Sequence, residues 1–330
     1  MKTPPAKGRW RRRLLAPPAL GLLVAGVLGL LLRYTVKDRL PILAAAFYGL
    51  PSLVVVLALV TSFGMYLFLR WRRRAIASGI LAILAIAAWV QTDVIRGTAP
   101  DRTEAQLRIV LWTACPLIDP NDGGLSLLQG TDAQIILMAE SGASTDYHKQ
   151  NWQSHFPDYH ICMLGHGLTF MSRYPFSNPR LVEMGRRTLI TAYDLDTPFG
   201  PLTVLGVDIE SNPFAWRKPF MDRIHAIATA PSHPVIIMGD FNTPHTSAHL
   251  DGLRRSFQHA IEEGTTGLVT TWPYLCPVLA LDYIWLSEHF VPVRTTVRRT
   301  LHSEHALVIA DVSLDMTQKP HAQQARSTDE

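Results

Sequence analysis

Three long apolar runs in the first 90 residues constrain this chain more than any other feature. Residues 14–32, 40–69 and 75–90 carry no charged side chain. An α-helix needs roughly 20 apolar residues to cross the hydrocarbon core of a bilayer. The first run is long enough. The second exceeds that length and contains Pro41 and Pro51, so tilt or an irregularity takes up the excess. We predict a three-helix membrane anchor over residues 1–90.

A cleaved signal peptide is the alternative for the first run, because basic residues at positions 7–13 precede it. No small-residue cleavage site follows, and two more apolar runs do, so an uncleaved anchor is favoured.

The distribution of Lys and Arg predicts the orientation of this anchor. The N-terminal tail and the loop at residues 70–74 hold more Lys and Arg than the loop at residues 33–39. Because short cytoplasmic loops are enriched in positive charge, we expect the tail inside the cell. Everything after Val90 then lies outside, in a multi-pass protein of the inner cell membrane with a periplasmic or extracytoplasmic domain.

The charge of the remaining chain differs from the overall net charge of +4. Residues 107–330 contain 16 basic and 23 acidic residues, a net charge of −7. Nucleic acids are bound mainly through clustered Lys and Arg. A nucleic-acid partner is therefore disfavoured, although a bound metal would offset part of the negative charge.

Three cysteines, Cys115, Cys162 and Cys276, are too few for a disulfide framework and lack the paired spacing of a structural zinc site. At most one bridge can form among them.

Domain boundaries follow from composition. Residues 91–106 are polar, contain Gly97 and Pro100, and show no apolar period, so we interpret them as a linker. A folded domain is expected over residues 107–316. The polar residues 317–330 form an expected disordered tail.

Short β-branched runs separated by helical stretches predict an α/β domain. The clearest candidate strands are residues 107–112, 133–138, 202–207, 235–238, 283–286 and 306–312. Three of the runs lead directly to a carboxylate: Glu140, Asp208 and Asp240. Carboxylates are rarely left in an apolar interior unless they are paired or bound to metal.

Each of these acids alone is best explained as the first solvated residue after a strand. As a set, together with Asn242, Asp282 and His305, they favour a shared site for metal and phosphate.

Five segments then resemble the endonuclease/exonuclease/phosphatase superfamily, which includes deoxyribonuclease I and exonuclease III. Residues 239–244, GDFNTP, resemble its GDFN motif. Residues 132–140 resemble its strand that ends in a metal-binding Glu, and residues 167–175 resemble its "ailSryP" strand. Residues 281–284 resemble its "iDyif" segment, and residues 303–305 its terminal SDH. The resemblance covers about residues 107–314. With the preceding apolar helices, the arrangement is similar to a membrane-anchored branch of the superfamily.

The resemblance implies a four-layer α/β sandwich, with two packed mixed sheets flanked by helices and the site at one end of the sheets. It also implies roles for individual residues. Glu140 would hold Mg²⁺ or Mn²⁺, as would Glu304 in the last motif. Asp240 would activate the attacking water, while Asn242 donates hydrogen bonds to the phosphate. Asp282 would hold the imidazole of His305.

Three positions depart from the family pattern. Thr113 stands where the family has Asn, and Glu304 stands where it has Asp. Asp208 stands where the family has His; it can add a metal ligand but cannot supply a cationic donor at neutral pH. Arg173, Arg217 or His166 are candidates to compensate.

The sequence therefore predicts a membrane-anchored, metal-dependent phosphoesterase. Its substrate would be a lipid head group, a small phosphoester or a nucleic acid. The alternative is a catalytically silent relative that uses the same fold as a binding module, which the substitutions at Thr113 and Asp208 favour.

Overall fold

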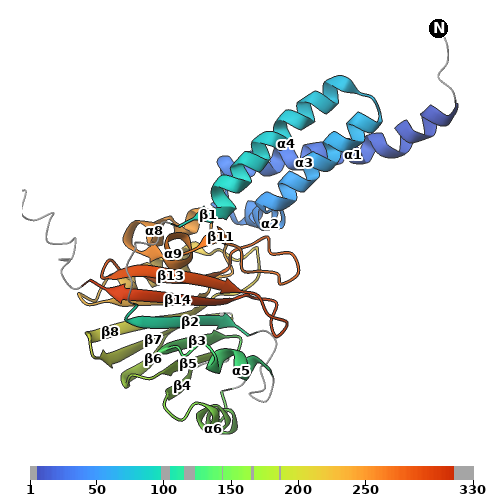
Figure 1. The fold of residues 1–330 in the computed structure, drawn as a ribbon. Helices are drawn as coiled ribbons and strands as arrows, with labels where there is room; N and C mark the ends of the chain where they lie inside the picture. Colours follow the sequence, from blue (N-terminus) through green and yellow to red (C-terminus); the bar gives the residue numbers. More distant parts are fainter. Residues whose placement is uncertain are drawn as a thin grey trace, which may run out of the picture. The chain divides into compact units, whose positions relative to one another are not determined.

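The computed structural model describes residues 6–97, 105–114, 123–142, 144–164, 167–185 and 187–315 (Figure 1). The chain divides into two compact units, an N-terminal helical unit and a larger unit that contains two large β-sheets. The tail predicted at residues 317–330, together with Cys115 and His166, lies outside the described residues.

The helical unit contains four helices: α1 (Ala6–Tyr34), α2 (Pro41–Gly49), α3 (Ser52–Phe68) and α4 (Arg72–Asp93). Two stretches, Arg12–Tyr34 and Arg72–Asp93, are long and apolar enough to cross a membrane. Helices α2 and α3 meet at a bend of 62° and make a third span only if the bent pair is one span. The break lies at Pro51, which lacks an N–H and disfavours helical geometry in the residue before it.

Small residues bring the helices of this unit close together. Val55 and Leu59 of α3 pack against Ala82 and Ala85 of α4. A side chain on Gly26 of α1 would meet Leu59 at 2.5 Å. Such packing of small against branched residues is typical of helix pairs in membranes.

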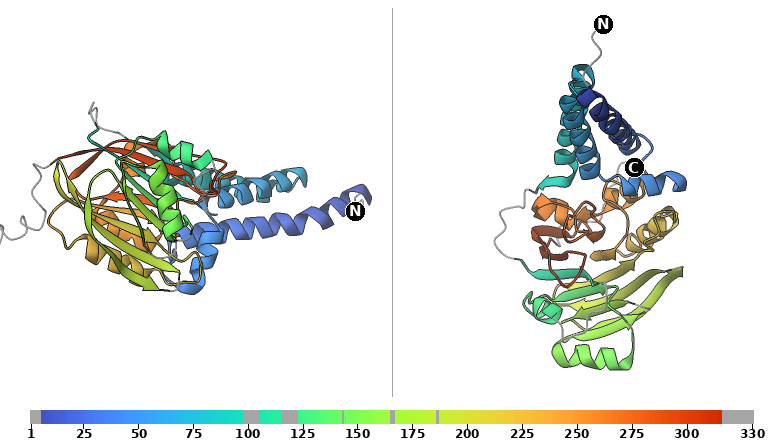
Figure 2. Two further views of the ribbon diagram at one scale, coloured as in Figure 1. Left: turned by 90° about the horizontal axis from the view of Figure 1, so that it is seen from below. Right: turned by 90° about the vertical axis from the view of Figure 1, so that its right-hand side faces the viewer.

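The larger unit is built on two six-stranded sheets that lie face to face (Figures 1 and 2). The first sheet has the order β13-β14-β2-β3-β5-β4. Its strands are Phe290–Arg298, Leu307–Leu314, Leu107–Thr113, Ile135–Ala139, Leu168–Ser172 and His160–Leu164, in that order. The pair β2 and β3 is parallel and the other pairs are antiparallel, so the sheet is mixed.

The second sheet has the order β10-β12-β9-β8-β7-β6. Its strands are Gln258–His259, Asp282–Leu286, Val235–Asp240, Gly200–Asp208, Thr188–Thr197 and Phe176–Gly185. Only β8 and β9 run parallel. Two short strands, β1 (Val94–Arg96) and β11 (Thr266–Leu268), lie outside these sheets; β1 falls within the stretch interpreted as a linker.

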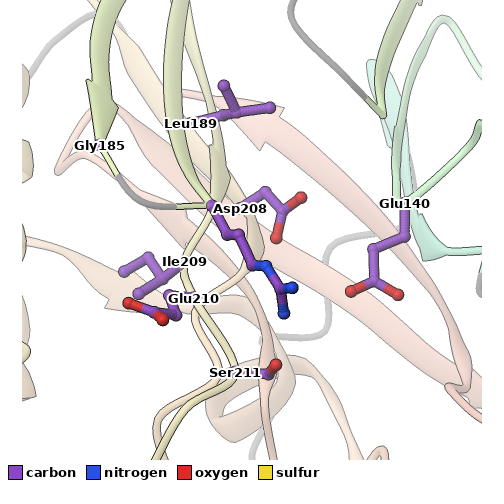
Figure 3. A pocket seen from close by; sticks show the side chains of 8 residues that line it. Glu140, Gly185, Leu189, Asp208, Ile209, Glu210 and Ser211 are labelled. Carbon is purple, nitrogen blue, oxygen red and sulfur yellow. The ribbon is translucent and has the colours of Figure 1, made fainter. Parts of the chain in front are cut away.

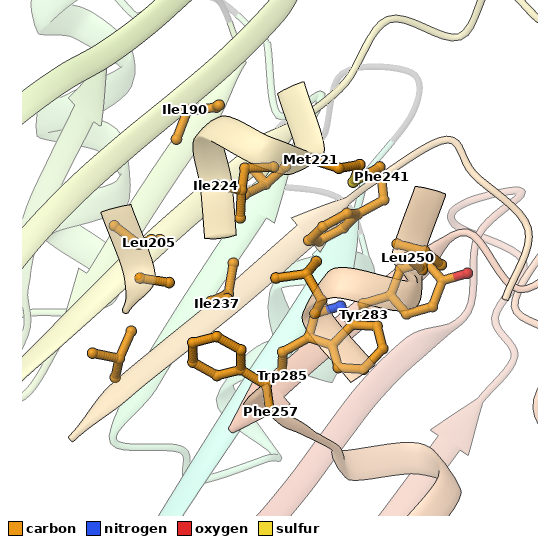
Figure 4. Packing of buried hydrophobic residues seen from close by; sticks show 14 of the residues in the cluster. Ile190, Leu205, Met221, Ile224, Ile237, Phe241, Leu250, Phe257, Tyr283 and Trp285 are labelled. Carbon is orange, nitrogen blue, oxygen red and sulfur yellow. The ribbon is translucent and has the colours of Figure 1, made fainter. Parts of the chain in front are cut away.

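Helices cover the outer faces of both sheets, which confirms the predicted α/β sandwich. Trp152 and Phe156 of α6 (Asp146–His155) and Leu128 of α5 (Gly123–Gln129) pack against the first sheet. Helices α7 (Lys218–Ala228) and α8 (Asp251–Ser256) pack against the second sheet through Met221, Ile224 and Leu253, and Figure 4 shows part of this cluster. A 3₁₀ turn at Ala248–Leu250 and α9 (Ala260–Gly264) complete the elements.

The inner faces of the sheets meet in an apolar core. Phe170 of β5 stacks on Tyr193 of β7 with ring centroids 4.0 Å apart. Gly206 of β8 leaves room for Leu137 of β3, because a Cβ at position 206 would lie 3.1 Å from that leucine.

All six predicted strands are present, with ends within two residues of the predicted bounds. Their fully buried runs explain this agreement, because β-branched residues flanked by polar ones are the strongest sequence signal for a buried strand.

Candidate functional site

Three aspartates stand side by side across the second sheet. The strand register pairs Asp208 of β8 with Asp240 of β9, and Asp240 with Asp282 of β12. They occupy equivalent positions on neighbouring strands, so their side chains leave the same face of the sheet. All three are at least nine-tenths buried.

Glu140 approaches this row from the first sheet. It follows the last residue of β3 and has a left-handed backbone, with φ of 51°. Gly167 permits this turn, since a Cβ there would lie 3.3 Å from the Glu140 Cα. Figure 3 shows the carboxylates of Glu140 and Asp208 directed into the same space.

Glu140, Asp208 and Asp240 form one cluster of oxygen ligands. Each offers a carboxylate oxygen, and these atoms lie within 4.8 Å of one another. A second group with the same spacing joins Asp240 to Asp282 and His305. Asp240 therefore belongs to both groups.

Asn242 fixes the orientation of Asp240. Its backbone N–H donates to Asp240 Oδ1 at 2.8 Å, and its Nδ2 donates to Asp240 Oδ2 at 3.0 Å. The same Nδ2 donates to the Ile209 carbonyl at 2.8 Å. Both amide hydrogens of Asn242 are therefore used within the protein, and its φ of 45° suits the tight turn.

A buried arginine holds this turn in place. Arg217 is 1% exposed, and its Nη2 donates to the Asn242 carbonyl at 3.3 Å. Its Nη1 donates to the carbonyls of Asn212 and Ala215 in the loop after β8. Arg217 thus fixes the position of the site backbone, and it is not aimed at a substrate phosphate.

Asp282 and His305 form a buried pair. His305 Nδ1 lies 2.9 Å from Asp282 Oδ2 and 3.1 Å from Oδ1. Thr113 donates its hydroxyl hydrogen to Asp282 Oδ1 from the opposite sheet. Thr113, at the position where the family has Asn, therefore supports the acid that orients His305.

The loop before β14 is anchored to the same place. Ser303 donates from its hydroxyl to the Thr113 carbonyl at 2.6 Å, and its oxygen accepts from the His305 N–H at 2.9 Å. Trp272 lies beside the imidazole of His305, with ring centroids 6.4 Å apart.

The pKa values of Asp208, Asp240 and His305 are all raised, but burial contributes to this only for the two aspartates. Burial, and then the neighbouring Glu140, raise the pKa of Asp208 to about 7. Burial and then Asp282 likewise raise the pKa of Asp240 well above its usual range. Burial lowers the pKa of His305, but Asp282 and Asp240 outweigh it and raise the pKa to about 9. At neutral pH the imidazole is a cation.

Two sequence-predicted residues lie elsewhere. Glu304 is exposed and belongs to neither cluster of described acids. Arg173 pairs with Asp132 and bonds to Tyr159 at the end of β5 that lies away from the site. It therefore does not replace the cationic histidine that the family has at the position of Asp208. Cys162 and Cys276 are free thiols.

Arg187 is a site residue that the sequence reasoning missed. It lines a cavity of about 400 Å³ together with Glu140, Asp208, Leu189, Ile209 and Ser211. It is the only basic side chain among the described residues that line this cavity. The only sequence signal for it was the pair of arginines after Gly185. The strands on either side of this turn were not predicted, so the turn was not recognised.

Comparison with known proteins agrees with this geometry. Residues 123–305, more than half of the chain, match the model of the Endonuclease/Exonuclease/phosphatase family. No match to a curated protein sequence was found.

Solved structures share the fold at low sequence identity. A 3' phosphatase, NExo from Neisseria, bound to a product DNA hairpin, aligns with a TM-score of 0.51 at 15% identity. The alignment covers 63% of this chain and 99% of that one. Humanized D. rerio TDP2 aligns with a TM-score of 0.51 at 16% identity, covering 63% of this chain and 98% of that one.

A protein of the same family from Bacteroides vulgatus gives a TM-score of 0.50 at 14% identity, covering 63% of this chain and 99% of that one. Endonucleases, exonucleases and phosphatases all hydrolyse phosphoester bonds, so this fold supports that chemistry. With its mixed sheets and its matching segment, the chain belongs to the endonuclease/exonuclease/phosphatase family.

Proposed function

We propose that this chain is a membrane-anchored phosphoesterase that uses a divalent metal. The observation that carries the proposal is that a cluster of three carboxylates shares Asp240 with a second group, which contains a histidine. Glu140, Asp208 and Asp240 gather three carboxylates, and Asp240 also adjoins the buried pair of Asp282 and His305.

The donor set fits Mg²⁺ or Mn²⁺. Hard divalent cations prefer carboxylate oxygens, and three carboxylates within 4.8 Å repel one another unless a proton or a cation neutralises them. Asp208 is 9% exposed and accepts no hydrogen bond from any residue that the structure describes. Both oxygens of Asp240 already accept from Asn242. Glu140 and Asp208 would therefore hold the cation.

When bound, such a cation supplies Lewis-acid neutralisation of the charge on the phosphoryl oxygens. Asp240, oriented by Asn242, accepts the proton of the water that attacks phosphorus. In this assignment Asn242 positions Asp240 and does not contact the phosphate.

His305 acts on the other side of the reaction. Its Nδ1 is held by Asp282, which leaves Nε2 to donate a hydrogen bond. Because the imidazole is charged at neutral pH, Nε2 donates a proton to the leaving oxygen as the ester bond breaks. The products are an alcohol and a phosphate or phosphomonoester.

The helical unit supports anchoring in a membrane, with two or three spans. Lys and Arg are enriched in the N-terminal tail and at residues 70–74. By the positive-inside rule this supports an N-terminus in the cytoplasm. If α2 and α3 form one span, so that there are three, the catalytic unit then lies on the extracytoplasmic side.

Hydrolysis by the full chain in detergent tests the proposal. We expect Mg²⁺- or Mn²⁺-dependent turnover of bis-p-nitrophenyl phosphate or p-nitrophenyl phosphate. An Asp240→Ala variant should fall by a factor of roughly 10² to 10⁴, while Asp222→Ala, on the exposed face of α7, should retain wild-type activity. Turnover no greater than that of Asp240→Ala would support the silent binding module.

A further inference from the structure

Exposed apolar side chains gather at one end of the larger unit. Among the residues described there, six large apolar side chains are exposed, and five of them lie outside the strands. These five define the apolar rim: Tyr147 (70% exposed), Phe214 (62%), Trp216 (54%), Leu275 (89%) and Leu301 (85%). The sixth, Leu181, is in the middle of β6.

The topology places all five at the end of the sandwich that carries the site. Tyr147 lies in the first turn of α6, shortly after Glu140. Phe214 and Trp216 follow Asp208 at the end of β8. Leu275 precedes Asp282, the first residue of β12, and Leu301 precedes His305 in the loop before β14. Single exposed apolar residues are ordinary on a protein surface, but a group around one site marks an interaction surface.

The loop with the two aromatic residues is fixed to the site. Arg217 bonds to the carbonyls of Asn212 and Ala215, on either side of Phe214, and also to the carbonyl of Asn242. Phe214 and Trp216 are therefore held beside the site by a buried arginine, so their exposure belongs to a defined loop conformation.

The loops that carry Leu275 and Leu301 have equivalent ties. The Thr271 hydroxyl oxygen accepts from the Asp282 N–H, and the Thr271 carbonyl accepts from the Ala306 N–H, both close to the loop that carries Leu275. Ser303, two residues after Leu301, donates to the Thr113 carbonyl. Each of these contacts joins a rim loop to a site residue or its neighbour.

Charged side chains of both signs flank the rim, and Asp146 is an exposed acid next to Tyr147. Arg298 and Arg299 are exposed immediately before Leu301, and Arg187 lines the site cavity. Glu304 is the exposed acid on the same loop. Apolar and aromatic side chains flanked by arginines are the combination that binds the interface of an anionic bilayer.

We propose that the apolar rim contacts a phospholipid surface and that the substrate is a phosphoester carried on a lipid. The inference rests on the proposed phosphoesterase function and names its substrate class. It is supported by the rim, by its arginines, and by the presence in the same chain of helices apolar enough to enter a bilayer. The rim consists of exposed apolar and aromatic side chains and not of the clustered Lys and Arg that bind nucleic acids, which favours a bilayer over a nucleic acid as the occupant.

The full-length chain tests the proposal with two substrates in the same detergent. One is water-soluble bis-p-nitrophenyl phosphate, and the other is a phospholipid in mixed micelles that contain phosphatidylglycerol. The double variant Phe214→Ser, Trp216→Ser and the single variant Leu301→Ser alter the rim. Leu181→Ser is the matched control, because it removes an equally apolar exposed side chain outside the rim.

We expect the rim variants to lose at least tenfold in phospholipid hydrolysis and to stay within twofold of wild type on the soluble diester. Leu181→Ser should match wild type on both substrates. Hydrolysis of the soluble diester with none of the phospholipid would overturn the inference and leave the phosphoesterase function standing. Equal losses on both substrates would also overturn it, as would a rim effect seen only with a single-stranded oligonucleotide. If wild type hydrolyses neither substrate, the proposed function itself fails.

Quenching of tryptophan fluorescence by brominated lipid gives a readout independent of turnover. The full chain is placed in nanodiscs of phosphatidylcholine and phosphatidylglycerol, and wild type is compared with Trp216→Phe. The difference isolates Trp216 from the other seven tryptophans. We expect part of the quenched signal to disappear in the variant. Equal quenching in the two proteins would count against contact of the rim with lipid.

Discussion

His305 Nδ1 lies 2.9 Å from Asp282 Oδ2 in a buried pair, and this contact sets the charge of the imidazole. Burial alone lowers the pKa of His305, but the carboxylate of Asp282 outweighs it and raises the pKa to about 9. The protonated form is therefore present below pH 9 and is lost above it.

Activity should fall as the pH rises through about 9, because His305 then loses the proton that it donates. In Asp282→Asn the pH at which activity falls should drop by roughly 1–3 units. The pH profile of kcat/KM measures both. Thr113→Val is the control. It removes only a hydrogen bond to Asp282, so the pH at which activity falls should shift less than in Asp282→Asn. A profile unchanged in Asp282→Asn would contradict the role of the pair.

Removing a carboxylate from the acidic cluster should weaken metal binding. EDTA should abolish hydrolysis, and Mn²⁺ or Mg²⁺ should restore it. Asp208→Asn should raise the Kd for Mn²⁺ by at least about tenfold, as measured by isothermal titration calorimetry. Glu304→Gln, a change outside the cluster, should leave the Kd near wild type. Equal effects of the two variants would refute the assignment of Asp208.

The same substitution should stabilise the metal-free protein. Burial and Glu140 raise the pKa of Asp208 to about 7 in the folded state, so above that pH its charge opposes folding. Asp208→Asn removes this charge. Its melting temperature at pH 8 in EDTA should exceed that of wild type, and a lower value would be evidence against the repulsion.

Arg187 should bind substrate without taking part in proton transfer. Arg187→Ala should raise KM by roughly 10-fold, with a smaller effect on kcat, because a charge-assisted hydrogen bond contributes about 1.5–3 kcal/mol. Arg180→Ala is the control, since Arg180 pairs with Asp194 on the same hairpin and does not line the cavity. A loss confined to kcat would assign Arg187 a different role.

Gly239 should be irreplaceable for steric reasons. Its φ is 150°, and a Cβ there would lie 1.8 Å from the Val207 carbonyl oxygen. Gly239→Ala should lower the free energy of unfolding by about 3–5 kcal/mol. Gly200→Ala also has a positive φ, of 103°, but meets no atom within 4 Å, so it should cost only about 1 kcal/mol. Chemical denaturation compares the two, and equal losses would show that backbone conformation alone matters.

An ion pair away from the site should govern acid stability. Burial raises the pKa of Glu262, but its contact with His259 and the charge of Arg254 outweigh it and lower the pKa to about 2. Burial also lowers the pKa of His259, so Arg254 is the cationic partner at neutral pH. The stability from Glu262 is present above pH 4.5 and is lost as the pH falls through 2.

Glu262→Gln should lower the free energy of unfolding at pH 7 by roughly 1–2 kcal/mol. The difference from wild type should shrink as the pH approaches 2. Urea denaturation at several pH values measures this, and a difference independent of pH would mean that packing, and not charge, explains the loss.

The sequence predicted the buried strands well and the exposed hairpin poorly. Buried strands such as β3 and β9 have continuous apolar runs that end at a polar residue. The edge strand β6 contains Asn178 and Pro179 and has exposed side chains. Its sequence therefore shows neither a continuous apolar run nor a regular alternation of apolar and polar residues. The turn that presents Arg187 was missed for this reason.

The acids of the site were predictable because each follows an apolar run, whereas their partners were not. Thr113 and Asp282 are 169 positions apart and meet only because the two sheets face each other. The use of both amide hydrogens of Asn242 depends on the carbonyl of Ile209, the residue that follows β8. Such contacts arise from tertiary packing, which a local pattern does not contain.

Under the proposed function, the row formed by Asp208, Asp240 and Asp282 would make turnover a sensitive measure of correct strand alignment. If β9 slipped by one residue against β8 or β12, its aspartate would turn to the opposite face of the sheet. Phe241, which packs against α7 and α8 on the outer face, would then enter the space between the sheets. A chain misaligned in this way would have no activity. The specific activity of a preparation would then report the fraction of molecules whose central strands are correctly paired.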